Sequence, residues 1–271
     1  MKQQRNIQDY QLLCLAEQKA EGRQWSLLTS EEVSDKLSLS KLQTARLLYR
    51  LKSQNRILQL QRGLYLLPGK LPPGKLWMPS PYEALWAYMN WLGAKWQITG
   101  TAAFLKYGFT TQIPQTISIY NDKISDTLET SSWKFVFIKI NQTKIGNIQF
   151  FSMSGGIEIP YSSKARTIFD ALYDGSRFNT AIESINWLIS IKDNKNDIQE
   201  FINCCLIYGD KQTICRSGFI LEKLGFDVSR ILKYLEPMKN STMISLVPGS
   251  RKGKIEKKWS TIENFHFTNL D

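Results

Sequence analysis

Two helix-start signals stand close together near the beginning of the chain. Thr29 with Glu32, and Ser40 with Gln43, each fit a capping box, in which two side chains three residues apart bond each other's backbone N–H groups. The link between the two predicted helices, SLS, is short enough for a helix-turn-helix corner. With an amphipathic helix before them, the helices expected here cover residues 6–20, 30–37 and 41–54.

Residues 56–68, RILQLQRGLYLLP, carry a hairpin signal. An alternating run meets a second apolar run at Arg62-Gly63, and the segment ends at Pro68. Three helices followed by a two-stranded hairpin form a winged helix. The hairpin side chains expected to pack against the helices are Ile57, Leu64 and Leu66. The side chains expected to line the core face of the first helix are Ile7, Tyr10, Leu13 and Cys14.

This region also has an unusual charge balance. Nine basic residues lie between Lys36 and Lys75, and no Asp or Glu occurs between Asp35 and Glu83. The whole chain has a formal net charge of +11, whereas residues 160–236 hold ten basic and ten acidic residues. A positive surplus confined to one end is typical of a nucleic-acid footprint. The smaller basic cluster RKGKIEKK, near the C-terminus, is interpreted as a solvated loop.

The helix over 41–54 is the candidate recognition helix. At 100° per residue its polar arc contains Gln43, Arg46, Arg50, Ser53 and Gln54, and its apolar side contains Ala45, Leu47, Leu48 and Leu51. Arg and Gln match guanine and adenine edges in the major groove. The candidate DNA-binding residues are Lys41, Gln43, Thr44, Arg46, Arg50 and Arg62, of which Lys41 and Thr44 are expected at phosphate and Arg62 at the hairpin tip. An ordinary solvated helix face is the alternative. If about six phosphates are neutralised, the logarithm of the binding constant should fall with the logarithm of salt with a slope of about −5.

The rest of the chain predicts a larger body. Residues 71–81 are rich in Pro and Gly and indicate a linker. Helical and strand-like runs alternate up to Pro160, helical patterns follow, among them one over residues 176–192, and TMISLVP and NFHF are expected as strands. The fold class expected is α+β, a winged helix-turn-helix followed by a mixed α/β unit and a helical C-terminal region. The expected boundaries are 1–70 for the winged helix, 71–81 for the linker and 82–271 for the body, divided into 82–160 and 161–271.

Several classes of site are disfavoured by the residues present. The single histidine, His266, cannot build a histidine metal cluster, and we expect it to be a packed strand residue. The four cysteines lack zinc-site spacing and are expected to be reduced core residues. Asp170 and Asp174 share a helix face but lack an apparent third metal ligand. No enzyme activity, cofactor or metal is therefore expected. The absence of a long apolar run and of a secretory signal predicts a cytoplasmic protein without a membrane segment.

Four stretches together give the chain a family resemblance. QRGLYLLP, SSKARTIFDAL, GFILEKLG and the terminal stretch with Trp259 ahead of NFHF are similar to the AbiEi family, the antitoxins of bacterial type IV toxin-antitoxin systems that act in phage defence. The resemblance implies an autorepressor whose winged helix binds inverted repeats in its own promoter. It also implies a C-terminal region that counteracts a nucleotidyltransferase-like toxin, with or without direct binding. Carried over by position, DNA contact falls on Gln43, Arg46, Arg50 and Arg62, and the candidate antitoxicity residues are Arg166, Asp170 and Arg216.

Two other functions remain open at this point. The body could be a nucleotide- or nucleic-acid-modifying enzyme for which the winged helix is a targeting module. A nucleotide or divalent cation that raises the melting temperature of residues 77–271 would favour this function. Alternatively, the body could be an interaction surface that sequesters a protein partner, and co-purification with the product of the adjacent gene would support that function.

Overall fold

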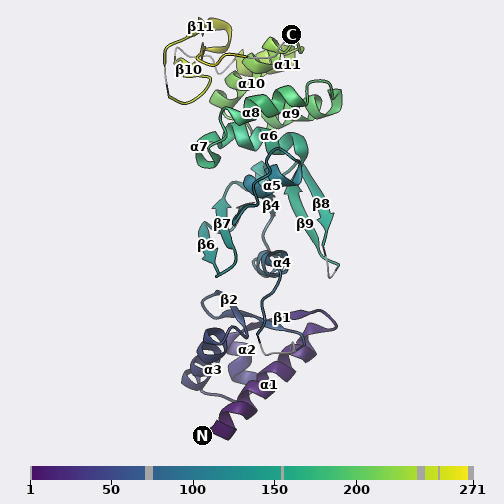
Figure 1. Ribbon diagram of the computed structural model, residues 1–271, viewed down its shortest axis with the longest axis vertical. Helices are drawn as coiled ribbons and strands as arrows, with labels where there is room; N and C mark the ends of the chain where they lie inside the picture. The colour runs from purple at the N-terminus through teal and green to yellow at the C-terminus, as the bar shows by residue number, and fades with distance from the viewer. Residues whose placement is uncertain (1, 71–75, 154–155, 237–241, 250, 268–271) are drawn as a thin grey trace. The chain divides into compact units, whose positions relative to one another are not determined.

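The computed structural model describes residues 2–70, 76–153, 156–236, 242–249 and 251–267, with side chains from Ile7 onward (Figure 1). The chain divides into two compact units, Met1–Ala94 with Phe151–Ile159, and Lys95–Phe150 with Pro160–Asp271. Both contain helices and strands, and the expected α+β class with a helical C-terminal region is confirmed.

The first unit begins with the three predicted helices, α1 Lys2–Ala20, α2 Ser30–Lys36 and α3 Lys41–Ser53. Both capping boxes are present. The Glu32 N–H donates to Thr29 Oγ1 at 3.2 Å, and the Thr29 N–H donates to Glu32 Oε2 at 2.8 Å. The matching bonds between Ser40 and Gln43 measure 3.4 and 2.9 Å. These bonds satisfy N–H groups that have no partner inside a helix, and they fix where α2 and α3 begin.

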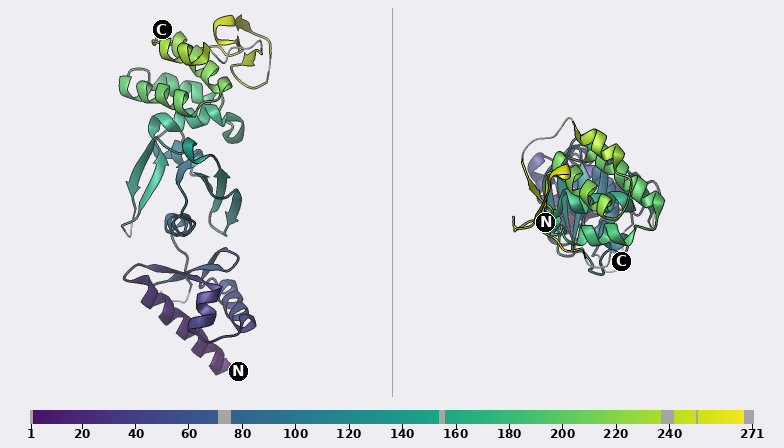
Figure 2. Two further views of the ribbon diagram at one scale, coloured as in Figure 1. Left: turned by 180° about the vertical axis from the view of Figure 1, so that it is seen from behind. Right: turned by 90° about the horizontal axis from the view of Figure 1, so that it is seen from above.

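A small antiparallel sheet packs on these helices, which lie on one of its faces (Figures 1 and 2). Its strands are β1 Trp25–Thr29, β2 Leu58–Gln61 and β3 Leu64–Pro68, in the order β1-β3-β2. The expected hairpin is β2 and β3, and its turn at Arg62-Gly63 uses the positive φ of +81° that glycine adopts freely. The sequence did not predict β1, because WSLLT carries no turn signal and pairs with a strand that follows only after α3.

The helices and the small sheet share one apolar core. Its buried members are Leu12, Ala16, Leu28, Val33, Leu47, Leu48, Leu51, Ile57 and Leu67. Ile57 was expected there, but the placement of Leu64 and Leu66 against the helices was wrong. They alternate with Leu67 along β3 and therefore face the other side of the sheet, where they are buried too. Apolar residues cover both faces of β3, so hydrophobicity could not distinguish them.

Helix α4, Pro81–Trp91, covers that second face and belongs to the first unit. The Tyr88 hydroxyl donates to Gln61 Oε1 at 3.0 Å, and Trp86 meets Trp25 edge-on with ring centroids 5.9 Å apart. The compact unit is therefore longer than the expected 1–70 domain, because the sheet of the winged helix is a two-sided layer that needs α4 as its second cover.

The core face of α1 also differs from the prediction. Leu12, Leu13 and Ala16 are buried, whereas Ile7 and Tyr10 are 55% and 66% exposed. Helix α1 is rotated about its axis relative to the prediction, because Asp9 lies on its inner face and is only 9% exposed. The Asp9 carboxylate pairs there with Arg50 and Arg56, in place of the apolar contact that the sequence pattern predicted.

The second unit contains most of a six-stranded sheet of order β6-β7-β5-β4-β9-β8. The strands are β4 Trp96–Thr99, β5 Thr116–Asn121, β6 Asp126–Glu129, β7 Lys134–Lys139, β8 Ile148–Ser152 and β9 Glu158–Ser162. β4 is antiparallel to β5 and parallel to β9, and β5 is parallel to β7. α5, Thr101–Lys106, follows β4, and η1, Gln142–Lys144, precedes β8. Every residue of β4 is buried, as expected for a central strand.

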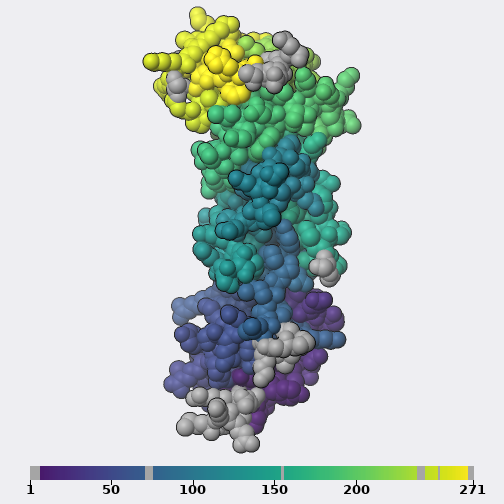
Figure 3. Space-filling model, in the orientation of Figure 1, coloured from purple at the N-terminus to yellow at the C-terminus, as the bar shows by residue number. Residues whose placement is uncertain are grey.

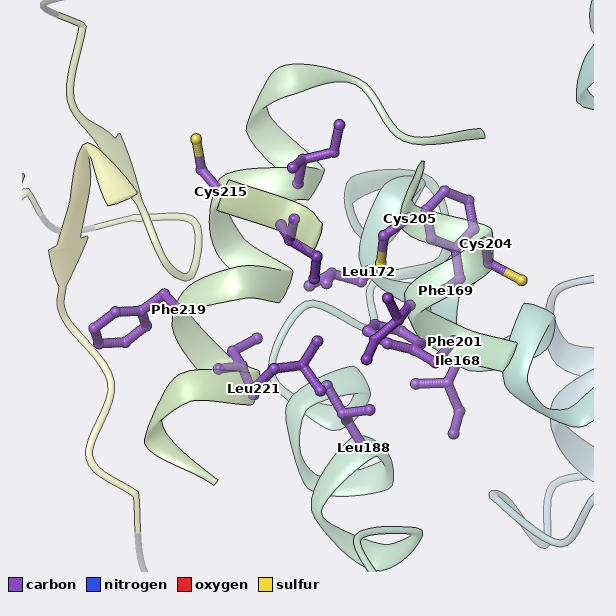
Figure 4. Packing of buried hydrophobic residues seen from close by; sticks show 14 of the residues in the cluster. Ile168, Phe169, Leu172, Leu188, Phe201, Cys204, Cys205, Cys215, Phe219 and Leu221 are labelled. Carbon is purple, nitrogen blue, oxygen red and sulfur yellow. The ribbon is translucent and has the colours of Figure 1, made fainter. Parts of the chain in front are cut away.

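Helices form the rest of the second unit's core. They are α6 Lys164–Tyr173, α7 Gly175–Phe178, α8 Glu183–Ser190, α9 Lys195–Tyr208, α10 Lys211–Lys223 and α11 Ser229–Leu235. Figure 4 shows Leu172 of α6, Leu188 of α8 and Phe201 of α9 in one apolar cluster. The predicted helix over 176–192 is divided into α7 and α8, because Asn179 adopts a left-handed conformation with φ of 54° and ends α7.

The C-terminal tail packs on α10. Its strands are β10 Ile244–Ser245, β11 Lys254–Glu256 and β12 Thr261–Glu263, with the short helix η3 Lys257–Trp259 (yellow in Figure 3). Trp259 is 1% exposed and lies against Gly218, where a Cβ atom would come within 2.0 Å of the indole ring. The expected strand at NFHF is wrong, and His266 is exposed rather than packed. The β11–η3 segment covers most of the expected solvated loop, and its lysines are exposed.

Cys204, Cys205 and Cys215 are buried as expected, and Cys14 is half-buried. In the part of the chain that the structure describes, no helix is long and apolar enough to cross a membrane.

Candidate nucleic-acid interface

Helix α3 has one buried face and one exposed face. Thr44, Leu47, Leu48 and Leu51 are buried. The exposed residues of the helix are Lys41, Leu42, Gln43, Ala45, Arg46, Tyr49, Lys52 and Ser53. Ala45, expected on the core side, is therefore a correction. We use "α3 face" for Leu42, Ala45, Arg46 and Tyr49.

Positive charge dominates α3. The helix carries Lys41, Arg46, Arg50 and Lys52 and no carboxylate. The side chains of Arg46 and Lys41 make no hydrogen bond or ion pair with any described residue, while Lys52 Nζ donates to Gln59 Oε1 at 2.7 Å. An exposed guanidinium without a protein partner keeps its five N–H donors available for an incoming ligand.

Arg50 occupies a different position. Its Nη2 pairs with Asp9 Oδ1, and Arg56 Nη1 pairs with the other oxygen of the same carboxylate at 3.2 Å. The side chain of Arg50 is 25% exposed and that of Asp9 13%. This cluster ties α1 to α3 and to the residue that leads into β2. The sequence assigned Arg50 to a DNA base, but in the structure it holds the helices together.

Two other predicted contacts are also occupied inside the protein. Thr44 is 2% exposed, and its hydroxyl donates to the Ser40 carbonyl at 3.1 Å. In this conformation its hydroxyl is therefore not free for the predicted phosphate contact. Gln43 is exposed, but its Oε1 accepts from the Ser40 N–H at 2.9 Å, which leaves only the amide NH₂ for another partner.

The hairpin turn is docked on the start of α2. The Ser30 N–H donates to the Gly63 carbonyl at 2.8 Å, and Arg62 is exposed beside it. A groove of about 450 Å³ lies between this turn, α2 and α3. Its walls carry Lys41 and Arg62 but also the exposed Glu31 and Asp35. The surface of the winged helix is thus less free of acid than the sequence run suggested, because α2 contributes carboxylates at this end.

The candidate antitoxicity residues lie in the second unit, and two of them are interior. Arg166 and Asp170 are 2% and 0% exposed, and Arg166 Nε bonds Asp170 Oδ1 at 2.6 Å. Asp170 Oδ2 accepts from Thr99 Oγ1 at 2.8 Å and from Ser162 Oγ at 2.7 Å. A side chain buried in this way cannot touch a partner in this conformation.

Arg166 is satisfied on its other side as well. Its Nη2 donates to the Lys144 carbonyl at 3.0 Å, and its guanidinium lies 3.9 Å from the centroid of the Tyr208 ring. Asp170 beside it raises the pKa of Arg166 against the opposing effect of burial. The cluster connects α6 with β4, β9 and the η1 turn, so it is a structural hub of the second unit.

The remaining candidates make contacts within the second unit. Asp174, the second member of the expected carboxylate pair, accepts from the Tyr120 hydroxyl at 2.6 Å. No group of three or more metal-ligating side chains occurs in the described ranges. Arg216 is half-buried, its Nε donates to the Ser245 carbonyl at 3.0 Å, and burial lowers its pKa.

Sequence reasoning missed Leu42 and Tyr49, which stand at the centre of the exposed face. On the helical wheel both lie opposite Leu47, Leu48 and Leu51, so the signal was present. The polar pattern did not select them, because apolar side chains on a helix are typical of core residues.

The comparisons with known proteins show the fold alone. No family model and no curated protein matches the chain. Among solved structures, the chain is similar to the crystal structure of the Rv2827c protein from Mycobacterium tuberculosis, with a TM-score of 0.53 and 14% identity over 88% of this chain and 86% of the other. The architecture is therefore shared over nearly the full length of both proteins, at an identity that does not carry function.

Proposed function

We propose that the first unit binds duplex DNA through the α3 face and Arg62, and that the protein is a type IV antitoxin that represses its own operon. One observation carries the proposal. Arg46 is exposed and without a partner among the described residues, on a carboxylate-free helix whose start is fixed by the Ser40–Gln43 capping box and whose inner face packs in the apolar core.

The physical argument is electrostatic. Four cations on α3, with Arg62 at the turn, would replace counterions condensed on the DNA backbone, a favourable contribution that weakens as salt rises. Because Arg50 and Arg56 share one carboxylate, even their cluster with Asp9 keeps a net positive charge. Arg46 is the side chain best placed for a base, since Arg binds guanine O6 and N7 in a forked geometry.

The second half of the proposal concerns the second unit, which counteracts a nucleotidyltransferase-like toxin. Its support is the resemblance to the AbiEi antitoxins in SSKARTIFDAL and GFILEKLG. In the structure these stretches form α6 and α10, whose apolar residues share one core. Exposed surface around them, rather than Arg166 and Asp170, would have to meet the toxin or its target.

DNA binding is tested by fluorescence anisotropy with a duplex from the upstream promoter. Arg46→Ala should weaken specific binding about 10- to 100-fold, the usual cost of one base-reading arginine. Arg230→Ala is the matched control, because it removes another exposed arginine, from the second unit. Equal affinity of both variants and the native protein would remove α3 from the interface.

The antitoxin role is tested by co-expression with a nucleotidyltransferase-like gene from the same operon. Growth should be rescued by the full chain, and also by its Arg46→Ala variant supplied from an independent promoter, because repression and antitoxicity reside in different units. Failure of the full chain to rescue growth would refute the antitoxin assignment and leave the DNA assignment standing.

A further inference from the structure

The α3 face combines one unpaired arginine with exposed apolar side chains. Leu42 is 60% exposed and Tyr49 is 74% exposed. They stand two turns apart on one side of the helix, about 10 Å along its axis, with Ala45 and Arg46 between them. Single exposed apolar residues are ordinary, but here Leu42, Ala45 and Tyr49 surround Arg46, whose side chain has no partner among the described residues.

The positive charge around the α3 face limits which partner can cover it. Lys41 and Lys52 lie beside the α3 face, Arg46 belongs to it, and α3 has no carboxylate. A second copy of the chain packed face to face would bring two such sets of cations together, which is unfavourable. A polyanion with apolar groups at the bottom of a groove fits both properties.

Duplex DNA offers that combination in its major groove. The groove admits an α-helix, and its only apolar group at a base edge is the C5-methyl of thymine. We propose that Leu42 and Tyr49 each contact the methyl group of one thymine, and that these two thymines lie on opposite sides of the base read by Arg46. This inference rests on the proposed DNA-binding function and adds the sequence preference of the same site.

The spacing of the two side chains makes the preference specific. About 10 Å along the helix corresponds to about three base-pair steps when the helix lies along the groove. Each operator half-site should therefore contain two thymines about three base pairs apart, one on each side of a guanine. Gln43, Thr44 and Arg50 add little to this pattern, because the cap, the core and Asp9 occupy them.

The test compares promoter duplexes made with dTTP or with dUTP, since uracil pairs like thymine but lacks the methyl group. The native protein should bind the uracil duplex about four-fold more weakly for each lost contact, or about ten- to twenty-fold for two. Leu42→Ala and Tyr49→Ser should each lose affinity for the thymine duplex and lose part of the discrimination. Their double variant should bind both duplexes equally.

Controls separate a contact from a disturbed fold. Ile207→Ala, at an isoleucine of the second unit that is 61% exposed, should keep the full discrimination. Tyr49→Phe should also keep it, because the ring remains. All variants should melt at the native temperature, since Leu42 and Tyr49 are outside the core.

Every outcome of the uracil test either supports or overturns the thymine inference. Equal binding of the two duplexes by the native protein, while Arg46→Ala still weakens binding, overturns the thymine inference and leaves the proposed function intact. Loss of discrimination in Ile207→Ala, or its full retention in the Leu42/Tyr49 double variant, overturns it too. Failure to bind any promoter duplex refutes both proposals. If the native protein is a dimer, the Leu42/Tyr49 double variant is a monomer and uracil has no effect, the α3 face binds a second copy of the chain and the thymine inference is overturned.

Discussion

Helices α3 and α6 use arginine in opposite ways. On α6, Arg166 has a carboxylate four residues on, a loop carbonyl and an aromatic ring, and it is 2% exposed. On α3, Arg46 has Arg50 four residues on, and it is exposed without a partner in the described structure. The same side chain is a structural hub where the fold supplies every acceptor and a candidate ligand-binding group where the fold supplies none.

Arg50 lies between these two cases. It shares Asp9 with Arg56 and is a quarter exposed, so it is partly structural and partly surface. Exposure of the arginine side chain therefore orders the three residues, from Arg166 at 2% through Arg50 at 25% to the exposed Arg46. The same ordering should appear when stability and DNA affinity are measured separately.

The largest effect is expected at Asp170. Asp170→Ala leaves the Arg166 guanidinium buried without its counter-charge, which should lower the free energy of unfolding by about 3–5 kcal/mol. Urea denaturation measures this loss, and Asp193→Ala, at an exposed carboxylate, serves as control. The double variant Arg166→Met/Asp170→Leu should be more stable than Asp170→Ala, because it removes both charges. Equal stability of Asp170→Ala and the native protein would contradict the role of this cluster as a hub.

The next effect distinguishes Arg50 from Arg46. Arg50→Ala should lower the free energy of unfolding by about 1–3 kcal/mol, because Asp9 then keeps only Arg56. Arg46→Ala should leave it within about 0.5 kcal/mol, as for an ordinary surface change. Thermal melting of both variants, paired with promoter binding, makes the comparison. If Arg46→Ala is the less stable variant, the assignment of the two arginines is reversed.

The smallest effect is expected at Glu222, which is paired but largely at the surface. The hydrogen bond from Lys258, with a second from Trp259 Nε1 at 2.6 Å, lowers the pKa of Glu222. A carboxyl group with a lowered pKa in the folded state adds stability above its unfolded pKa of about 4.3, and this stability is lost as the pH falls through the folded value. Its side chain is 38% exposed, so solvent screening should keep the contribution below about 1 kcal/mol.

The Glu222 prediction is checked by the melting temperature as a function of pH. The native protein should exceed Glu222→Gln in stability at neutral pH, and the two should converge below the usual carboxyl range. Glu183→Gln, at an exposed carboxylate, should follow the native curve throughout. A difference that persists at low pH would show that Glu222 acts through packing and not through its charge.

Much of the first unit could be predicted from sequence because its signals are local. The two capping boxes, the three helices and the hairpin turn each depend on residues a few positions apart. Strand β1 and the inner face of α1 could not be predicted, because both depend on distant partners. β1 needs β3, and Asp9 needs Arg50 and Arg56, which lie 41 and 47 positions along the chain.

The candidate site was predicted only in part for the same reason. Exposure of Arg46 and Arg62 follows from their position on a helix face and in a turn. Burial of Thr44 follows from the helical wheel as well, but its hydroxyl favoured a surface interpretation. The pairing of Arg50 depends on α1, and the interior position of Arg166 and Asp170 depends on β4, β9 and the η1 turn, none of which a local pattern reveals.

The contact between Gly218 and Trp259 has a practical consequence for deletion mapping. Because Gly218 has no side chain, the Trp259 indole packs directly against the backbone of α10 at that position. A chain shortened ahead of the tail would leave a hollow the size of one tryptophan and expose apolar surface of about 150–250 Å² that the ring now shields. Loss of activity in such a fragment would then report aggregation, so fragments used to test the proposed antitoxin role should retain Trp259.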